Sequence, residues 1–137
     1  MNRIKDKIKD LEKATEELES FLPSDFKEYK NNKTKAACER YFEKIVEGMV
    51  DLAFIFIKEK KLKKAEEDKA AFDILSNEKI ISEELAEKLK SAKGMRNVIA
   101  HEYQYGKIND EQVFEAVSKE IIQDSKEFLS KIKIQIK

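Results

Sequence analysis

Apolar residues recur every three or four positions along much of the chain, which is the period of a helix with one buried face. Between residues 3 and 22 this stripe consists of Ile4, Ile8, Leu11, Leu18 and Leu22. Thr15 occupies the remaining seam position. Pro23 ends the predicted helix, because proline lacks the N–H that a helix interior requires.

A second helix is predicted from about Thr34 to about Lys61. It follows the turn-rich connection "PSDFKEYKNNKT", in which Phe26 and Tyr29 are placed to cover the end of a bundle. Its seam consists of Cys38, Phe42, Ile45, Met49, Leu52 and Phe56. Further apolar residues widen that surface: Tyr41, Val46, Ala53, Ile55 and Ile57. Because so wide a surface needs more than one neighbour, we expect this to be the central helix, or one that also faces a second subunit.

The second half of the chain predicts three further helices. A short one is expected around residues 70–75, after the charged block "KEKKLKKAEED". Ser82 is a good N-cap for a helix that continues to about Tyr103, and Asn109 or Asp110 can cap a last helix that extends into the tail "KIKIQIK". Short connections favour antiparallel neighbours. We therefore predict one all-α domain over residues 1–137, an up-and-down four-helix bundle with an additional short helix.

The composition agrees with a helical fold and narrows the possible functions. Only three glycines and one proline occur, and 41% of the residues are charged. Lys plus Arg and Asp plus Glu both number 28, so any contact with a nucleic acid must be local. Cys38 and His101 are the only residues of their types, which excludes an internal disulfide and a zinc site. No segment is apolar enough to span a membrane, so the cytoplasm is the expected compartment.

Polar side chains that could take part in catalysis or binding gather in "MRNVIAHEYQYG", residues 95–106. On a helix that continues unbroken through this stretch, Asn97 and His101 share a face, so the amide can orient the imidazole for proton transfer. Arg96 and His101 then point about 140° apart. Either the helix loosens near the histidine, or both groups converge on something that lies across the helix end. The residues between them are expected to form the packing face: Val98, Ile99 and Ala100.

The number of proton-transfer groups suggests a dimer. Cleavage of a phosphodiester by side chains needs a base, an acid and a cation for the developing charge, and one chain has one histidine. A two-fold dimer that joins two copies of Arg96 and His101 would supply them. The structural alternative is that His101 only caps a helix and that Arg96 only pairs with Glu102 or another acidic neighbour.

This stretch resembles the signature of HEPN-domain proteins: Arg96, four residues, His101, one residue, Tyr103, with Asn97 directly after the arginine. The resemblance is greatest to the HepT-like toxins that are paired with MNT nucleotidyltransferase antitoxins. It extends over "IISEELAEKLKSAKGMRNVIAHEY" and the following "KINDEQVFEAV", whereas the first two helices match only in pattern. It implies a helical-bundle homodimer that acts as a metal-independent endoribonuclease toxin, without a cofactor, and that has an MNT-type antitoxin as its partner.

The resemblance also implies roles for individual residues. Arg96 would hold the scissile phosphate, His101 would assist proton transfer as the RNA 2′-hydroxyl attacks, and Asn97 would orient the site. Tyr103 matches the tyrosine that the partner nucleotidyltransferase modifies with AMP, a bulky anion that would obstruct the binding of RNA. The longer connection before the last helix leaves Tyr105 as an alternative acceptor. Two lysines are candidates for weak RNA contacts beside the cleft: Lys93 and Lys107.

Two other functions stay open on the sequence alone. The first is a non-catalytic nucleotide-binding or adaptor HEPN module, which would bind AMP or ATP without cutting RNA. The second is a purely structural dimer whose wide second helix forms the interface. A di-metal carboxylate bundle is excluded, because Val98 lies three residues before His101, where such a site needs a glutamate.

Overall fold

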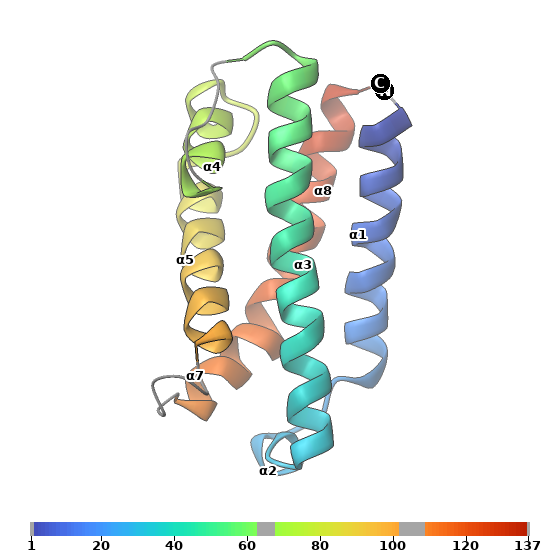
Figure 1. Ribbon diagram of the computed structural model, residues 1–137, viewed down its shortest axis with the longest axis vertical. Coiled ribbons are helices and arrows are strands. Elements are labelled where there is room, and N and C mark those ends of the chain that lie inside the picture. Colours follow the sequence, from blue (N-terminus) through green and yellow to red (C-terminus); the bar gives the residue numbers. More distant parts are fainter. Residues whose placement is uncertain (1, 63–67, 102–108, 137) are drawn as a thin grey trace.

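The computed structural model describes residues 2–62, 68–101 and 109–136, and every regular element in these ranges is helical. The long helices that form the bundle are α1 (Asn2–Phe21), α3 (Asn32–Glu59), α5 (Glu83–Ala100) and α8 (Ile121–Gln135). They alternate in direction, and α1 and α5 flank α3 with α8 packed behind (Figure 1). The prediction of an all-α up-and-down four-helix bundle is confirmed.

Shorter elements connect the long helices. The described ones are α2 (Phe26–Tyr29), α4 (Asp68–Asn77), α7 (Asp110–Glu115) and a π-helical turn, η1 (Ala116–Glu120). α4 is the predicted additional short helix, and it packs against α3 and α5. The π-helical turn joins α7 to α8, so the predicted last helix is continuous but changes its winding near its start. The sequence did not predict that change.

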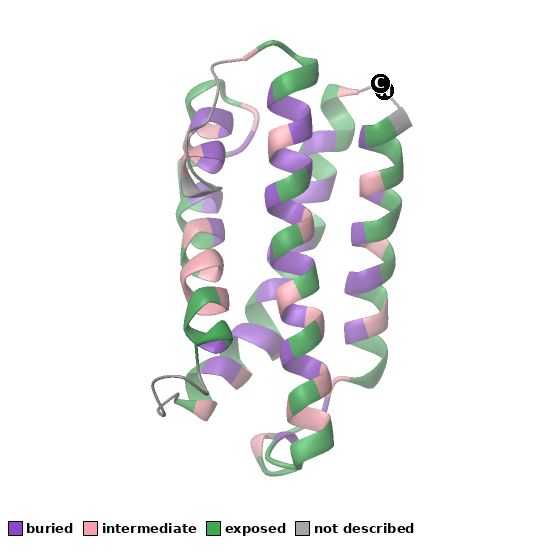
Figure 2. Cartoon of the chain, viewed as in Figure 1, coloured by how far each residue is buried: buried purple, intermediate pink, exposed green. Residues whose placement is uncertain are grey.

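The central helix is α3, as its wide apolar surface predicted. It contacts α1, α4, α5 and α8. Buried residues follow one another along its whole length, with exposed residues between them (Figure 2). All six residues of the predicted seam are buried: Cys38, Phe42, Ile45, Met49, Leu52 and Phe56. α3 begins at Asn32 rather than at Thr34, because the Asn31 side chain accepts hydrogen bonds from the backbone N–H groups of Lys33 and Thr34.

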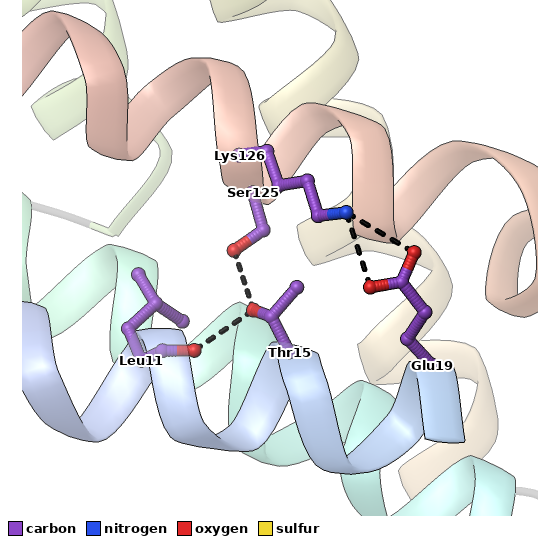
Figure 3. A network of polar contacts seen from close by, with 5 residues as sticks. All are labelled: Leu11, Thr15, Glu19, Ser125 and Lys126. Atoms are coloured by element: carbon purple, nitrogen blue, oxygen red, sulfur yellow. Dashed lines mark hydrogen bonds and ion pairs between the residues drawn. The ribbon is translucent and has the colours of Figure 1, made fainter. Parts of the chain in front are cut away.

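A pair of buried hydroxyl groups links α1 to α8 (Figure 3). Thr15 lies in the apolar seam, and its Oγ1 donates to the carbonyl of Leu11 at 2.8 Å. Its Oγ1 also lies 2.8 Å from Oγ of Ser125. Because the Thr15 proton is already donated, Ser125 is the donor in this second bond. At the surface beside them, Lys126 pairs with Glu19 at 3.1 Å.

Two described helices are followed by a left-handed residue that is not glycine. Lys61 follows α3 and Lys79 follows α4, and both adopt the left-handed backbone conformation, with φ of 56° and 60°. At each end a backbone N–H bonds back into the last turn: Leu62 to Ile57 and Ile80 to Leu75, both at 2.9 Å. After α3 the chain therefore turns where the sequence shows charge and no turn residue, whereas the turn after α4 lies in "SNEKIIS".

Aromatic rings close the end of the bundle at which α5 stops. Phe26 and Tyr29 of α2 both pack against Phe114 of α7, with ring centroids 5.8 and 5.0 Å apart. This confirms that the connection after α1 covers the bundle end, although it forms a helical turn that the sequence did not predict. The N-cap of that turn is Asp25, which accepts a hydrogen bond from the N–H of Glu28. The end of α5 therefore lies at the end of the bundle that the aromatic rings of α2 and α7 close.

Candidate functional site

The candidate residues lie on the last two turns of α5. Ser82 caps the start of this helix and accepts from the N–H of Leu85 at 3.0 Å, as predicted. The helix ends at Ala100, so it does not continue to Tyr103. Leu85, Leu89 and Ile99 are buried along one stripe. This stripe fixes the rotation of α5 and with it the direction of each polar group.

His101 is the C-cap of α5 and is exposed to solvent. Its backbone N–H donates a bifurcated hydrogen bond to the carbonyls of Asn97 and Val98, both at 3.2 Å. A bond shared in this way is common where a helix ends, so α5 stops at the histidine, and the two possibilities that the angle between Arg96 and His101 left open both remain. Tyr103, Tyr105 and Lys107 lie outside the described residues, so the AMP site and one lysine contact stay predictions.

Arg96 is held by an acidic residue from the central helix. Its guanidinium donates to the Glu47 carboxylate of α3, and the two groups come from helices that pack side by side. The Arg96 side chain is 25% exposed and that of Glu47 is 48% exposed, so the pair lies at the edge of the α3–α5 seam. In the part of the chain that the structure describes, the buried Nε of Arg96 has no hydrogen-bond partner. The guanidinium is therefore held at one end and keeps a donor unused.

Asn97 lies on the same face of α5 as His101 and is exposed. A backbone hydrogen bond joins the two residues, and the orienting hydrogen bond from the amide to the imidazole stays a prediction. The packing face that the sequence predicted between them is wrong in two of three positions. Ile99 is 4% exposed, but Val98 is 50% exposed and Ala100 is exposed too. Val98 turns about 100° away from the stripe that Ile99 continues, so only Ile99 reaches the core.

The sequence profile of the family described as ribonuclease HepT-like matches residues 11–132. That range includes α3, α5 and the whole candidate site. The chain belongs to the HepT-like family. No curated protein sequence matches this HepT-like chain significantly.

Solved structures share the fold of this HepT-like chain at low sequence identity. A toxin–antitoxin complex with AMP-PNP is 19% identical, with a TM-score of 0.87 over 98% of this chain and 99% of the other. A tri-AMPylated HEPN toxin of Shewanella oneidensis, in complex with an MNT antitoxin, is 20% identical, with a TM-score of 0.85 over 96% of each chain. The cytosolic protein YutE of Bacillus subtilis, of unknown function, is 16% identical, with a TM-score of 0.81 over 98% of this chain and 89% of its own.

Within this HepT-like chain, Glu47 is the site residue that sequence reasoning missed. The sequence allowed an acidic partner for Arg96, but it offered no means to choose Glu47, which is 49 positions away. Lys93, the other described lysine candidate, is half-buried on α5. Among the described residues no group of three or more His, Cys, Asp or Glu could hold a metal ion, and no helix is long and apolar enough to cross a membrane. The chemistry that the site offers is that of a guanidinium and an imidazole.

Proposed function

We propose that this chain is a metal-independent endoribonuclease toxin of a toxin–antitoxin pair, with an active site shared by the two subunits of a homodimer. The observation that supports it most is the Arg96 guanidinium, which Glu47 of the central helix holds at the surface of a HepT-like bundle. A planar fork of this kind matches two phosphate oxygens, which a lysine cannot do. The scissile phosphate of RNA is the expected ligand.

The proposed reaction uses the RNA 2′-hydroxyl as its nucleophile. A base removes the 2′-hydroxyl proton, the 2′-oxygen forms a bond to phosphorus, and the bond from phosphorus to the 5′-oxygen breaks. An acid returns a proton to that leaving oxygen, so the products are a cyclic phosphate and a 5′-hydroxyl. Arg96 would stabilise the extra negative charge on the phosphate. No metal or cofactor is needed for any of these steps.

The dimer follows from the number and direction of the catalytic groups. One chain contributes one imidazole, and residues five positions apart on a helix point about 140° from one another, so we expect that Arg96 and His101 of a single subunit do not surround a phosphate. A second copy placed on the exposed end of α5 would add a second imidazole and guanidinium. Three side chains at that end are exposed and would lie at this contact: Asn97, Val98 and His101.

The proposed partner is an MNT-type antitoxin that attaches AMP to Tyr103. The Shewanella oneidensis HEPN toxin in complex with its MNT antitoxin is tri-AMPylated, and its fold is that of this chain. AMP on a tyrosine near His101 would place a bulky anion beside the catalytic groups and repel the RNA backbone. Mass spectrometry of the chain, incubated with such an antitoxin and ATP, should place AMP on Tyr103, and Tyr103→Phe should remove it.

Cleavage of RNA in the presence of a chelator tests the proposed activity. Purified protein should cut RNA without added metal, and His101→Ala and Arg96→Ala should each reduce the rate by at least about a hundredfold. Arg3→Ala is the matched control, since Arg3 is an exposed arginine of α1, a helix that does not carry the site. Wild-type rates in either site variant, with the fold intact by circular dichroism, would refute the catalytic roles. Calorimetry with AMP and ATP separates the adaptor alternative, which predicts binding without cleavage.

A mixing experiment tests the shared site. Subunits of wild type and His101→Ala are unfolded together and refolded at several ratios. If each site needs two imidazoles, the activity falls with the square of the wild-type fraction. If each subunit works alone, the activity falls in proportion to that fraction, and the shared site is refuted.

Glu47 gives a further test of Arg96. Glu47→Gln keeps an acceptor for the guanidinium but removes a negative charge beside the phosphate position. A charge at roughly 7 Å in a half-solvated setting is worth about 1 kcal/mol, so the KM for RNA should fall by about fivefold. An unchanged or higher KM would show that Arg96 does not bind the phosphate from its observed position.

A further inference from the structure

A cleft of about 630 Å³ lies between α5 and α8, on a face that the proposed reaction does not use. Its apolar lining comes from three helices and the π-helical turn: Phe42, Ala92, Met95, Ala116 and Ile121. The volume falls within the range of sites for small organic ligands, which are mostly apolar with a few polar groups.

Asp124 of α8 lines this cleft, and Lys88 is the residue of opposite charge that acts on it. The residue is 7% exposed, and within the described chain its carboxylate accepts no hydrogen bond and forms no ion pair. Burial raises the pKa of Asp124, and Glu120 and Glu127 raise it further against the opposing effect of Lys88. The Asp124 oxygens are not among the buried side-chain atoms that lack a hydrogen-bond partner, so they reach the solvent of the cleft, and an aspartate so largely buried is rare unless it is paired.

The rest of the lining is acidic in balance. The acidic residues are Glu84, Glu87, Glu120 and Asp124, and the basic residues are Lys88 and Lys119, so the formal charge is 2 − 4 = −2. Lys88 pairs with Glu84 of the same lining at 3.4 Å, and Lys119 pairs with Glu115 at 3.6 Å. Lys88 also acts on Asp124 from within the cleft, but no cation among the described residues forms an ion pair with this carboxylate.

The π-helical turn shapes this side of the cleft. Ala116, Lys119 and Glu120 all belong to η1, and all three line the cleft. A π-helical turn widens a helix by one residue and occurs often at functional sites. Here it precedes the turn of α8 that carries Asp124, so it sets the rotation with which that carboxylate meets the cleft.

We propose that this cleft binds a small aliphatic dication, with one ammonium or guanidinium group on the Asp124 carboxylate and the chain along Ala92 and Met95. The buried carboxylate would gain a charge-assisted hydrogen bond, and the apolar lining would cover the methylene groups. The second cationic group would lie at the acidic rim, where Glu84 and Glu87 are exposed. Two positive charges match the formal charge of the lining. This site is independent of RNA cleavage.

Titration with agmatine, a guanidinium and an ammonium joined by methylene groups, tests the proposal. Calorimetry should detect binding, and NMR of protein labelled at its methionine methyl groups should show that the Met95 signal shifts. Met49 is buried in the core at 0% exposed, so its signal is the internal reference and should stay in place. Binding should weaken as the salt concentration rises, because the contact is electrostatic.

Three comparisons decide the outcome. Asp124→Asn keeps the shape and should weaken binding by at least about tenfold. Asp6→Asn makes the same change at an exposed site on α1 and should leave the affinity within about twofold. The neutral 1,5-pentanediol should not bind. The proposal is refuted if agmatine does not bind at millimolar concentration, if Asp124→Asn binds as tightly, if the diol binds equally well, or if the Met95 signal does not move.

Discussion

The hydroxyl pair between α1 and α8 should respond unequally when its two members are removed. Ser125→Ala deletes one hydrogen bond and leaves Thr15 bonded to the Leu11 carbonyl, which should cost about 1 kcal/mol. Thr15→Val keeps the shape but leaves the Ser125 hydroxyl, at 0% exposed, without this partner, and should cost about 2 kcal/mol. The double variant leaves no orphaned hydroxyl and should cost about 1 kcal/mol, less than the sum of about 3 kcal/mol.

Urea denaturation followed by circular dichroism measures each free energy of unfolding, provided that the m-value stays constant. Ser130→Ala is the matched control, since Ser130 is exposed on the same helix and its change should stay within about 0.5 kcal/mol. Additive costs in the double variant would refute the coupling of the two hydroxyls. A cost for Thr15→Val no greater than that for Ser125→Ala would refute the argument from the orphaned donor.

Three further changes test other parts of the fold. Lys79→Gly should raise the free energy of unfolding by about 1 kcal/mol, because Lys79 has a φ of 60° that glycine adopts without strain. A variant that is no more stable to heat than the wild type would contradict this prediction. Burial raises the pKa of Cys38 to about 11. A thiol reagent near pH 8 should therefore label the folded chain at least about a hundredfold more slowly than the chain in urea. Equal labelling rates would contradict the buried thiol. The pKa of Asp124 is raised in the folded chain, so its ionised form destabilises the fold once the pH rises above about 3.9, the ordinary carboxyl value. Asp124→Asn should therefore stabilise the protein at neutral pH and lose that gain below about pH 4. A gain in stability that does not depend on pH would count against the raised pKa.

The helices could be predicted because each depends on residues that are close in sequence. The seam through Cys38, Phe42 and Ile45 follows from spacing, and the caps Ser82 and Asn109 accept the backbone hydrogen bonds that their residue types predicted. The ends of α3 and α4 were harder, since lysines at these positions adopt a conformation that sequence rules assign to glycine. Local pattern therefore gave the elements but not their last turns.

The candidate site could be predicted only in part, because it depends on how two helices lie against each other. The motif located Arg96 and His101, but the pairing of Arg96 with Glu47 follows from the rotation and register of α3 against α5, which spacing does not specify. Asp124 left a clearer signal. The apolar stripe of the last helix runs from Ile121 to Phe128 and passes through positions 124 and 125, so a buried aspartate could have been expected there.

Arg96 and His101 depend on different parts of the fold, and this bears on how the proposed site is assembled. Arg96 is fixed through Glu47 to the central helix, so its position is as stable as the α3–α5 contact. His101 lies where α5 ends, and its backbone N–H is shared between two carbonyls of the last turn, so its position depends on the end of that helix. On the proposed function, the subunit presents its phosphate-binding group on rigid structure and its proton-transfer group on the segment nearest the second copy. A second copy at this end of α5 would then lie against the imidazole, so the same dimer that supplies the second histidine would also influence the geometry of the first.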